Sequence, residues 1–228
     1  QVDRMDQGVG RVLRTLDELG IADDTVVIFL SDNGGCAEEV ERSADPKART
    51  GTADSFRSYG LPWANASNTP LRLFKQFVHE GGIATPLIAR GPGIRRGVTT
   101  DAVGHVIDLA PTCLDYAGAA YPQTLEGRAL TPQEGRTLRP LFGGGTRAGH
   151  ETIFWEHQGH RALRRGNWKL VASFGEPWEL YDLEADRTET NNLAAAHPDL
   201  VVELAAEHQR WSDRVGARPW AELRGRLR

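Results

Sequence analysis

The spacing of apolar and polar residues predicts α/β structure in the first part of the chain. Apolar residues recur at helical intervals over residues 5–19, and Gly20 follows where such a helix would end. Residues 26–30 are a continuous apolar run, which is typical of a strand buried on both faces in a parallel sheet. Helix, short turn and buried strand together make half of an α/β unit.

A polar stretch then separates this unit from the next apolar runs. Residues 38–65 are irregular and rich in turn-forming residues, so they either cover a functional site or form a solvated excursion. Residues 85–89 predict a second strand, which ends at Gly91, and residues 98–103 predict another. Asp108 is expected to cap a helix that continues to Ala117 and stops at Gly118.

The pattern changes after the glycine run at residues 143–145. Residues 152–156, 161–165, 168–173 and 178–183 are short strand-like runs separated by turns, which favours an antiparallel sheet. Pro198 then opens an amphipathic helix. We therefore expect two domains, an α/β domain at residues 1–145 and a small domain of antiparallel sheet and helix at residues 146–228.

Composition and charge exclude some classes of protein. The chain has 228 residues, 39% of them hydrophobic, and a formal net charge of −4, which gives no support for nucleic-acid binding. It has no apolar run of about eighteen residues, so no membrane span is expected. Of its two cysteines, Cys113 is expected to be buried and inert, whereas Cys36 follows a glycine turn that could lie near a site.

Two groups of residues are candidates for chemistry. Asp32 and Asn33 follow the first apolar run and precede two glycines; carboxylate and amide oxygens suit Ca²⁺ or Mg²⁺, but the same sequence is also a common turn. Lys75 lies near Phe74 and Phe77, where a lysine is either a fixed cation or a surface amine. Neither group decides between its two interpretations by itself.

Taken together, the motifs resemble the sulfatase family, and specifically its bacterial arylsulfatase type. The resemblance is carried by the segments Thr-Val-Val-Ile-Phe-Leu-Ser-Asp-Asn-Gly-Gly, Trp-Ala-Asn, Asn-Thr-Pro-Leu-Arg-Leu-Phe-Lys, His-Glu-Gly-Gly-Ile and Ile-Asp-Leu-Ala-Pro-Thr, which occur in the family's order. It covers residues 6–119 and implies the C-terminal half of an alkaline-phosphatase-like catalytic core.

The resemblance also implies roles for the candidate residues. Asp32 and Asn33 match two of the family's four metal ligands, usually of Ca²⁺, and Lys75 matches the lysine that binds the sulfate group. The implied reaction is hydrolysis of a small-molecule sulfate ester. Many relatives have arginine at the position of Ala84, so the resemblance does not define the site wall there.

Much of the family's site is missing from this sequence. The motif C-x-P-x-R or S-x-P-x-R, which provides the formylglycine nucleophile, does not occur, and the early Asp-Asp pair is also absent. The chain begins at Gln1 inside a helical pattern, as expected of a segment of something longer. We therefore expect an inactive C-terminal fragment whose partner is the missing N-terminal half. The alternatives are a phosphoesterase or phosphonate hydrolase of the same fold, and a non-catalytic truncated module.

Overall fold

A computed structural model describes residues 1–40 and 42–225 of the chain. Its residues group into two compact units. The first unit combines Gln1–Leu30 with Leu87–His150, and the second combines Ser31–Pro86 with Glu151–Arg228. The chain thus leaves the first unit directly after a strand and returns to it directly before another.

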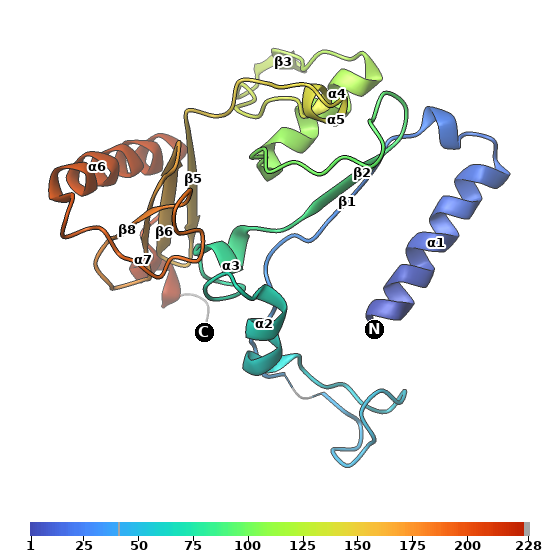
Figure 1. Cartoon of the computed structure of the whole chain (residues 1–228), viewed down its shortest axis with the longest axis horizontal. Coiled ribbons are helices and arrows are strands. Elements are labelled where there is room, and N and C mark those ends of the chain that lie inside the picture. Colours follow the sequence, from blue (N-terminus) through green and yellow to red (C-terminus); the bar gives the residue numbers. More distant parts are fainter. Residues whose placement is uncertain (41, 226–228) are drawn as a thin grey trace. The chain divides into compact units, whose positions relative to one another are not determined.

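The first unit begins with the expected helix and strand. Helix α1 spans Val2–Glu18, and Gly20 follows it with a φ of 69°, a left-handed conformation that favours glycine. The 3₁₀ turn η1, Ala22–Asp24, leads into strand β1, Val27–Leu30 (Figure 1). Strand β2, Leu87–Arg90, is the predicted second strand.

The expected surroundings of β1 were wrong. Strand β1 pairs with β2 in an antiparallel direction, from Val27 opposite Arg90 to Leu30 opposite Leu87. None of its residues is fully buried, and Phe29 is 40% exposed. A continuous apolar run indicates that a segment tends to be buried, but it does not indicate whether the neighbouring strand is parallel or antiparallel.

The rest of the first unit is built around a short helix. The 3₁₀ turn η2, Val106–Asp108, precedes helix α4, Leu109–Ala117, which ends as predicted at Gly118 with a φ of 63°. Strands β3, Thr124–Leu125, and β4, Arg128–Ala129, form a hairpin, and helix α5 spans Arg139–Phe142. The strand predicted at residues 98–103 is absent from the structure.

Two predictions about α4 have different outcomes. Asp108 precedes the helix as predicted, but its carboxylate accepts from the backbone nitrogens of His105 and Arg136 and makes no side-chain cap on α4. Cys113 is exposed and not buried, because α4 turns Thr112 inward instead.

The second unit contains the predicted antiparallel sheet. Its strands are β5 (Thr152–His157), β6 (His160–Arg165), β7 (Trp168–Ala172) and β8 (Glu179–Asp182), paired in sequence order. Helix α6, Pro198–Val215, follows at the predicted proline. Helices α2 (Gly60–Asn68), α3 (Glu80–Ile83) and α7 (Trp220–Arg224) were not predicted.

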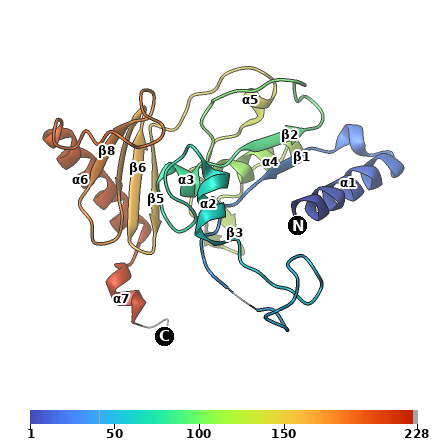
Figure 2. The same ribbon diagram turned by 60° about the horizontal axis from the view of Figure 1, so that its bottom comes forward.

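The sheet is buried on both faces. Leu163, Leu170 and Leu180 point to one face, where they pack against Leu204 of α6 (Figure 2). The alternate residues of the same strands point to the other face, where Ala162, Val171 and Tyr181 pack against Val78. Because side chains alternate along a strand, one helix and one loop of the second unit cover opposite faces of the sheet.

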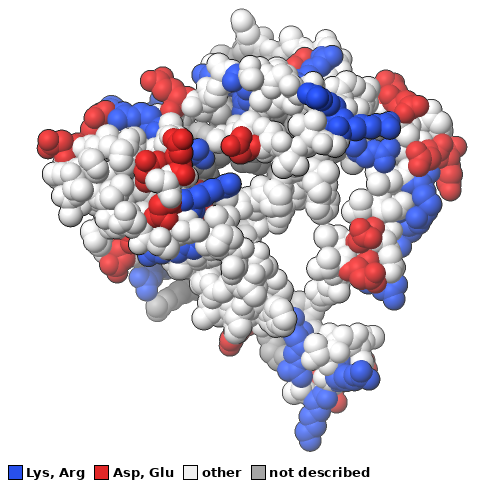
Figure 3. Space-filling model, viewed as in Figure 1, with Lys and Arg blue, Asp and Glu red and all other residues white. Residues whose placement is uncertain are grey.

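The polar stretch before α2 has no regular secondary structure in the residues described. Its basic side chains are visible at the bottom of Figure 3, and Arg42, Lys47, Arg49 and Arg57 are all exposed. The start of this stretch differs, because Glu38 contacts Lys75, as does Cys36 just before the stretch. The stretch thus contacts Lys75 at its start and then becomes a surface excursion, and its covering of a functional site stays a prediction.

No helix among the described residues is both long and apolar enough to span a lipid bilayer.

Candidate active site

The Asp-Asn-Gly-Gly loop is fixed by its two glycines. The backbone nitrogen of Gly34 donates to the Gly82 carbonyl at 3.0 Å, and a β-carbon on Gly34 would overlap the Gly81 carbonyl. A β-carbon on Gly35 would lie 2.6 Å from Ser67 Oγ, closer than atoms pack in proteins. The glycines thus allow this loop to lie against the second motif, backbone to backbone.

The second motif forms a closed loop, residues 72–81, which we call the Lys75 loop. The backbone nitrogen of Gly81 donates to the Arg72 carbonyl at 2.8 Å and closes its base. Asn68 bridges the two motifs, because its Oδ1 accepts from Gly35 N at 2.9 Å and its Nδ2 donates to the Leu73 carbonyl at 3.0 Å. This amide holds the two motifs in register.

The backbone of the Lys75 loop is strained on both sides of the lysine. Leu73 has a φ of 65° and Gln76 a φ of 87°, values that are unfavourable for residues with side chains. The backbone nitrogen of Lys75 donates to the Gly35 carbonyl at 3.0 Å. Strained backbone of this kind persists only where its surroundings fix it, and it is common at functional sites.

The ammonium of Lys75 lies in a small polar cluster. Its Nζ is 3.4 Å from Glu38 Oε2 and 3.9 Å from Cys36 Sγ, and Gln76 donates to the other Glu38 oxygen at 3.1 Å. The hydrogen bond to Glu38 raises the pKa of Lys75, and the carboxylate of Asp32 adds a smaller effect in the same direction. The charged form of Lys75 is therefore stabilised mainly by Glu38.

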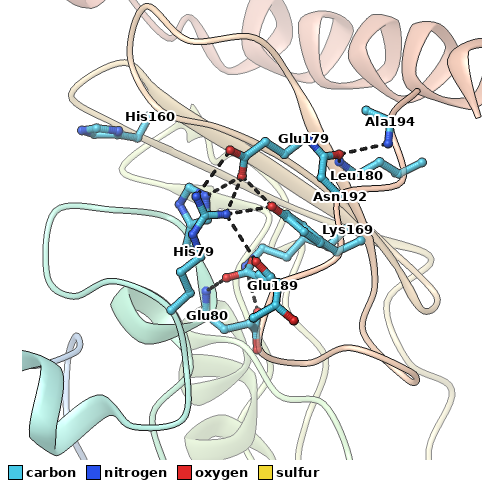
Figure 4. A network of polar contacts seen from close by, with 12 residues as sticks. His79, Glu80, His160, Lys169, Glu179, Leu180, Glu189, Asn192 and Ala194 are labelled. Atoms are coloured by element: carbon cyan, nitrogen blue, oxygen red, sulfur yellow. Dashed lines mark hydrogen bonds and ion pairs between the residues drawn. The ribbon is translucent and has the colours of Figure 1, made fainter. Parts of the chain in front are cut away.

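A network of charged groups joins the base of the Lys75 loop to the sheet. Arg72 donates to Glu179 Oε2 at 2.8 Å and to the Tyr181 hydroxyl at 2.7 Å, and that hydroxyl donates to Glu179 at 2.8 Å. His79 Nε2 lies 3.1 Å from the same Glu179 oxygen. Figure 4 shows His79 and Glu179 directed toward one another from the loop and from β8.

Lys169 makes a second connection between loop and sheet. It is fully buried, and its Nζ lies 2.8 Å from Glu80 Oε1 and 2.8 Å from Glu189 Oε1 (Figure 4). The other Glu189 oxygen accepts from the backbone nitrogen of Glu80 at 2.8 Å. Burial raises the pKa of Glu189; it acts the same way on Glu80, but there Lys169 outweighs it and the pKa of Glu80 is lowered.

The three predicted site residues thus lie in one unit, on two interlocked loops. The structure adds partners that the sequence pattern did not indicate, namely Glu38 and Gln76, while Cys36 was recognised only by its position after the glycines. Glu38 was missed because nothing in an irregular polar stretch marks which residue turns inward. Asn68 lies inside the motif that carried the resemblance, so the motif itself was the available signal.

The metal-ligand set of these loops is small. Asp32 and Asn33 offer one carboxylate and one amide oxygen, the ligand types that Ca²⁺ prefers, whereas Ca²⁺ takes about six to eight ligands. Within residues 1–40 and 42–225, no three histidine, cysteine or acidic side chains form a group that could hold a metal ion. The chemistry of the two residues fits Ca²⁺, but two ligands alone do not make a Ca²⁺ site.

Comparison with known proteins gives two family matches. The family model described as Sulfatase matches residues 1–119, and the model described as N-sulphoglucosamine sulphohydrolase, C-terminal, matches residues 72–210. The chain is similar to an uncharacterized sulfatase of Schizosaccharomyces pombe, with 36% identity over 89% of this chain and 40% of that protein. It is also similar to an N-acetylglucosamine-6-O-sulfatase of Bacteroides thetaiotaomicron, with 28% identity over 83% of this chain and 30% of that protein.

Solved structures show the fold. A Bacteroides thetaiotaomicron structure from work on glycosaminoglycan metabolism matches 94% of this chain and 43% of its own, with 25% identity and a TM-score of 0.66. A phosphonate monoester hydrolase of Silicibacter pomeroyi matches 92% of this chain and 38% of its own, with 24% identity and a TM-score of 0.58. The expected fold class is confirmed, and the chain spans well under half the length of these relatives.

Proposed function

Because the chain belongs to the sulfatase family, we propose that it is the C-terminal part of a sulfuric ester hydrolase and supplies part of that enzyme's metal and sulfate site. Asp32 and Asn33 provide two oxygen ligands for Ca²⁺, or for Mg²⁺ in its place. Lys75 binds an oxygen of the sulfate group. The remaining ligands and the formylglycine nucleophile belong to the N-terminal half.

The observation that carries this proposal is the close packing of the two motifs. The Gly34–Gly82 and Lys75–Gly35 hydrogen bonds tie the two loops together directly beside the candidate residues. Three donors are available on an ammonium group, and contacts with Glu38 and Cys36 leave at least one for a substrate oxygen.

The chemistry follows from charge. A divalent cation held near Asp32 and Asn33 would act as a Lewis acid toward the sulfate oxygens. As the ester bond breaks, its electron pair goes to the leaving oxygen, and Lys75 would stabilise the negative charge that the sulfate oxygens carry in the transition state. This is the type of electrostatic effect that usually contributes most to catalysis. The substrate class is a small-molecule sulfate ester.

A phosphonate or phosphate ester hydrolase is the second candidate, and the fold of the Silicibacter pomeroyi enzyme favours it. The charged groups in this chain suit a sulfate ester and a phosphonate or phosphate ester equally. The nucleophile in the N-terminal half would therefore determine which ester is hydrolysed. Turnover of an aryl sulfate against a phosphonate monoester by the joined enzyme distinguishes the two. If neither is turned over, the chain is a non-catalytic module.

Lys75→Ala in the enzyme that contains the N-terminal half tests the role of Lys75. We expect kcat/KM for an aryl sulfate to fall by roughly 10²–10³, the usual cost of removing one such donor. Thermal melting should change little, since a half-exposed lysine contributes under about 0.5 kcal/mol to stability.

Lys47→Ala is the matched control, because Lys47 is an exposed lysine in the same unit. It should leave both turnover and melting unchanged. Near wild-type turnover in Lys75→Ala would exclude the sulfate-binding role, and a melting temperature that collapses in parallel with activity would make Lys75 a structural residue.

A further inference from the structure

The Lys75 loop is attached to the sheet at both ends, and in its middle the backbone nitrogen of Lys75 donates to the Gly35 carbonyl of the neighbouring loop at 3.0 Å. Its base is closed by the Gly81–Arg72 hydrogen bond, and both flanks of that base carry charged side chains. Arg72 stands at one end, and His79 and Glu80 stand at the other. Lys75 lies between these attachments, so together with its bond to Gly35 they help to hold its backbone.

One carboxylate, that of Glu179, connects the two flanks; Arg72 also donates to the Tyr181 hydroxyl at 2.7 Å and to the Glu189 carbonyl at 3.4 Å. Glu179 accepts from Arg72 at 2.8 Å, from His79 at 3.1 Å and from the Tyr181 hydroxyl at 2.8 Å. It is thus the only acidic side chain in the described structure that bonds to both flanks of the loop base. Burial opposes its charge, yet the three donors hold the pKa of Glu179 below its usual value.

Strand register places all the attachment points on one face of the sheet. Lys169 is opposite Tyr181, and Val171 is opposite Glu179, across the β7–β8 pair. Alternate residues on a strand share a face, so Lys169, Tyr181 and Glu179 face the same side as Val171. That is the side on which Val78 of the Lys75 loop packs.

Stability alone is a weak reason for so many charges at this position. Replacing a buried ion pair by apolar residues is often neutral or stabilising, because the charges must be stripped of water. Fixed charge pairs do, however, define the relative positions of the segments that carry them. Functional side chains need supporting groups that hold them within about 0.5 Å of their productive position.

We propose that Glu179 is a positioning residue for Lys75 and that the C-terminal sheet serves as the scaffold of the sulfate-binding loop. The inference rests on the proposed function of Lys75. Glu179 touches neither the substrate nor the metal; it acts through Arg72 and His79 to hold the loop where the ammonium meets the sulfate group.

A double-mutant cycle between Glu179→Gln and Lys75→Ala tests this in the enzyme that contains the N-terminal half. Glutamine keeps the shape of Glu179 and removes its charge. We expect Glu179→Gln to lower kcat/KM for an aryl sulfate about tenfold, because small displacements of a catalytic group are costly. In the Lys75→Ala background the same change should cost less than about twofold, since its effect is transmitted through Lys75.

Glu207→Gln is the matched control. Glu207 lies 3.1 Å from Arg165 in the same unit and accepts from Thr152. It belongs to helix α6, whose Leu204 packs on the face of the sheet opposite to Val78 of the Lys75 loop. It should lower the melting temperature about as much as Glu179→Gln does and leave kcat/KM unchanged. Equal activity losses in Glu179→Gln and Glu207→Gln would overturn the proposal.

Tyr181→Phe keeps the proposal testable if Glu179→Gln fails to fold. It removes only the hydroxyl that joins Arg72 to Glu179 and retains the buried ring. We expect a smaller loss of kcat/KM, about threefold, that again disappears in the Lys75→Ala background. Losses that are the same in both backgrounds would show that the network acts independently of Lys75.

The cycle separates this proposal from the one on which it rests. If Lys75→Ala alone leaves turnover unchanged, the sulfate-binding role of Lys75 fails. If Lys75→Ala lowers turnover while Glu179→Gln costs the same with and without Lys75, only the positioning role of Glu179 fails.

Discussion

At the scale of single residues, the candidate site combines acidic and basic side chains on two short loops. Lys75 is held by Glu38 and lies within electrostatic range of Asp32. In the proposed function, a cation at Asp32 and Asn33 and the ammonium of Lys75 would both attract an anionic group. Such an arrangement suits a sulfate ester, whose charge lies on its oxygens.

Replacing Asp32 should weaken metal binding. In the enzyme that contains the N-terminal half, we expect Asp32→Ala to raise the dissociation constant for Ca²⁺ at least about tenfold, since even outer partners of metal ligands contribute that much. Calorimetric titration with Ca²⁺ measures it directly. Asp23→Ala, at an exposed aspartate in η1, is the control. Unchanged affinity in Asp32→Ala would remove Asp32 from the ligand set.

His79 should make stability depend on pH. Burial lowers its pKa from 6.5 to about 4. Between these values the unfolded chain binds the proton and the folded chain does not, so the free energy of unfolding falls as pH drops from 6.5 toward 4. The gap corresponds to ~3 kcal/mol when it is fully expressed.

Urea unfolding at several pH values from 7 to 4 measures this effect. His79→Gln should lose less stability over the range than the wild type, whereas His157→Gln, at an exposed histidine, should match the wild type. If His79→Gln and the wild type lose stability equally, His79 is not the group responsible.

At the scale of elements, glycines allow the two motif loops to interlock. A β-carbon on Gly81 would overlap the carbonyl groups of Arg72 and Leu73 at the base of the Lys75 loop. These are backbone atoms that cannot rotate away, so we expect Gly81→Ala to destabilise the protein by about 1–3 kcal/mol or more. Gly149, which has no neighbour within 4 Å of a β-carbon, provides the control Gly149→Ala. Equal unfolding midpoints for the two variants would contradict close packing at Gly81.

Elements with a strong local pattern were predictable, and elements that depend on tertiary contacts were not. Strands β5–β8 and helix α6 follow from turn glycines, alternation and a proline at the helix start. The antiparallel partner of β1 was missed because an apolar run does not encode direction. Helix α2 was missed because Pro62 and the flanking polar residues are typical of a loop.

For the candidate site, the sequence indicated the candidate residues but not the side chains that hold their loops in place. Asp32, Asn33 and Lys75 stand in motifs short enough to recognise. Glu179 and Lys169 lie about a hundred residues beyond the Lys75 loop, on strands whose pattern indicates only a sheet. Their contacts with the loop arise from strand register, which a single sequence does not reveal.

At the scale of the whole molecule, the chain matches only part of its relatives. It spans 40% of the Schizosaccharomyces pombe relative and 30% of the Bacteroides thetaiotaomicron relative. Its sequence has neither nucleophile motif, and two oxygen ligands are too few for Ca²⁺. The proposed function therefore requires groups from an N-terminal half.

The most direct test is aryl sulfate turnover by this chain alone and by the chain joined to a nucleophile-bearing N-terminal half, each with and without Lys75→Ala. The account predicts no turnover by the chain alone, turnover by the joined enzyme, and a loss of roughly 10²–10³ when Lys75 is replaced there. Turnover by the purified chain alone that Lys75→Ala abolishes would contradict it.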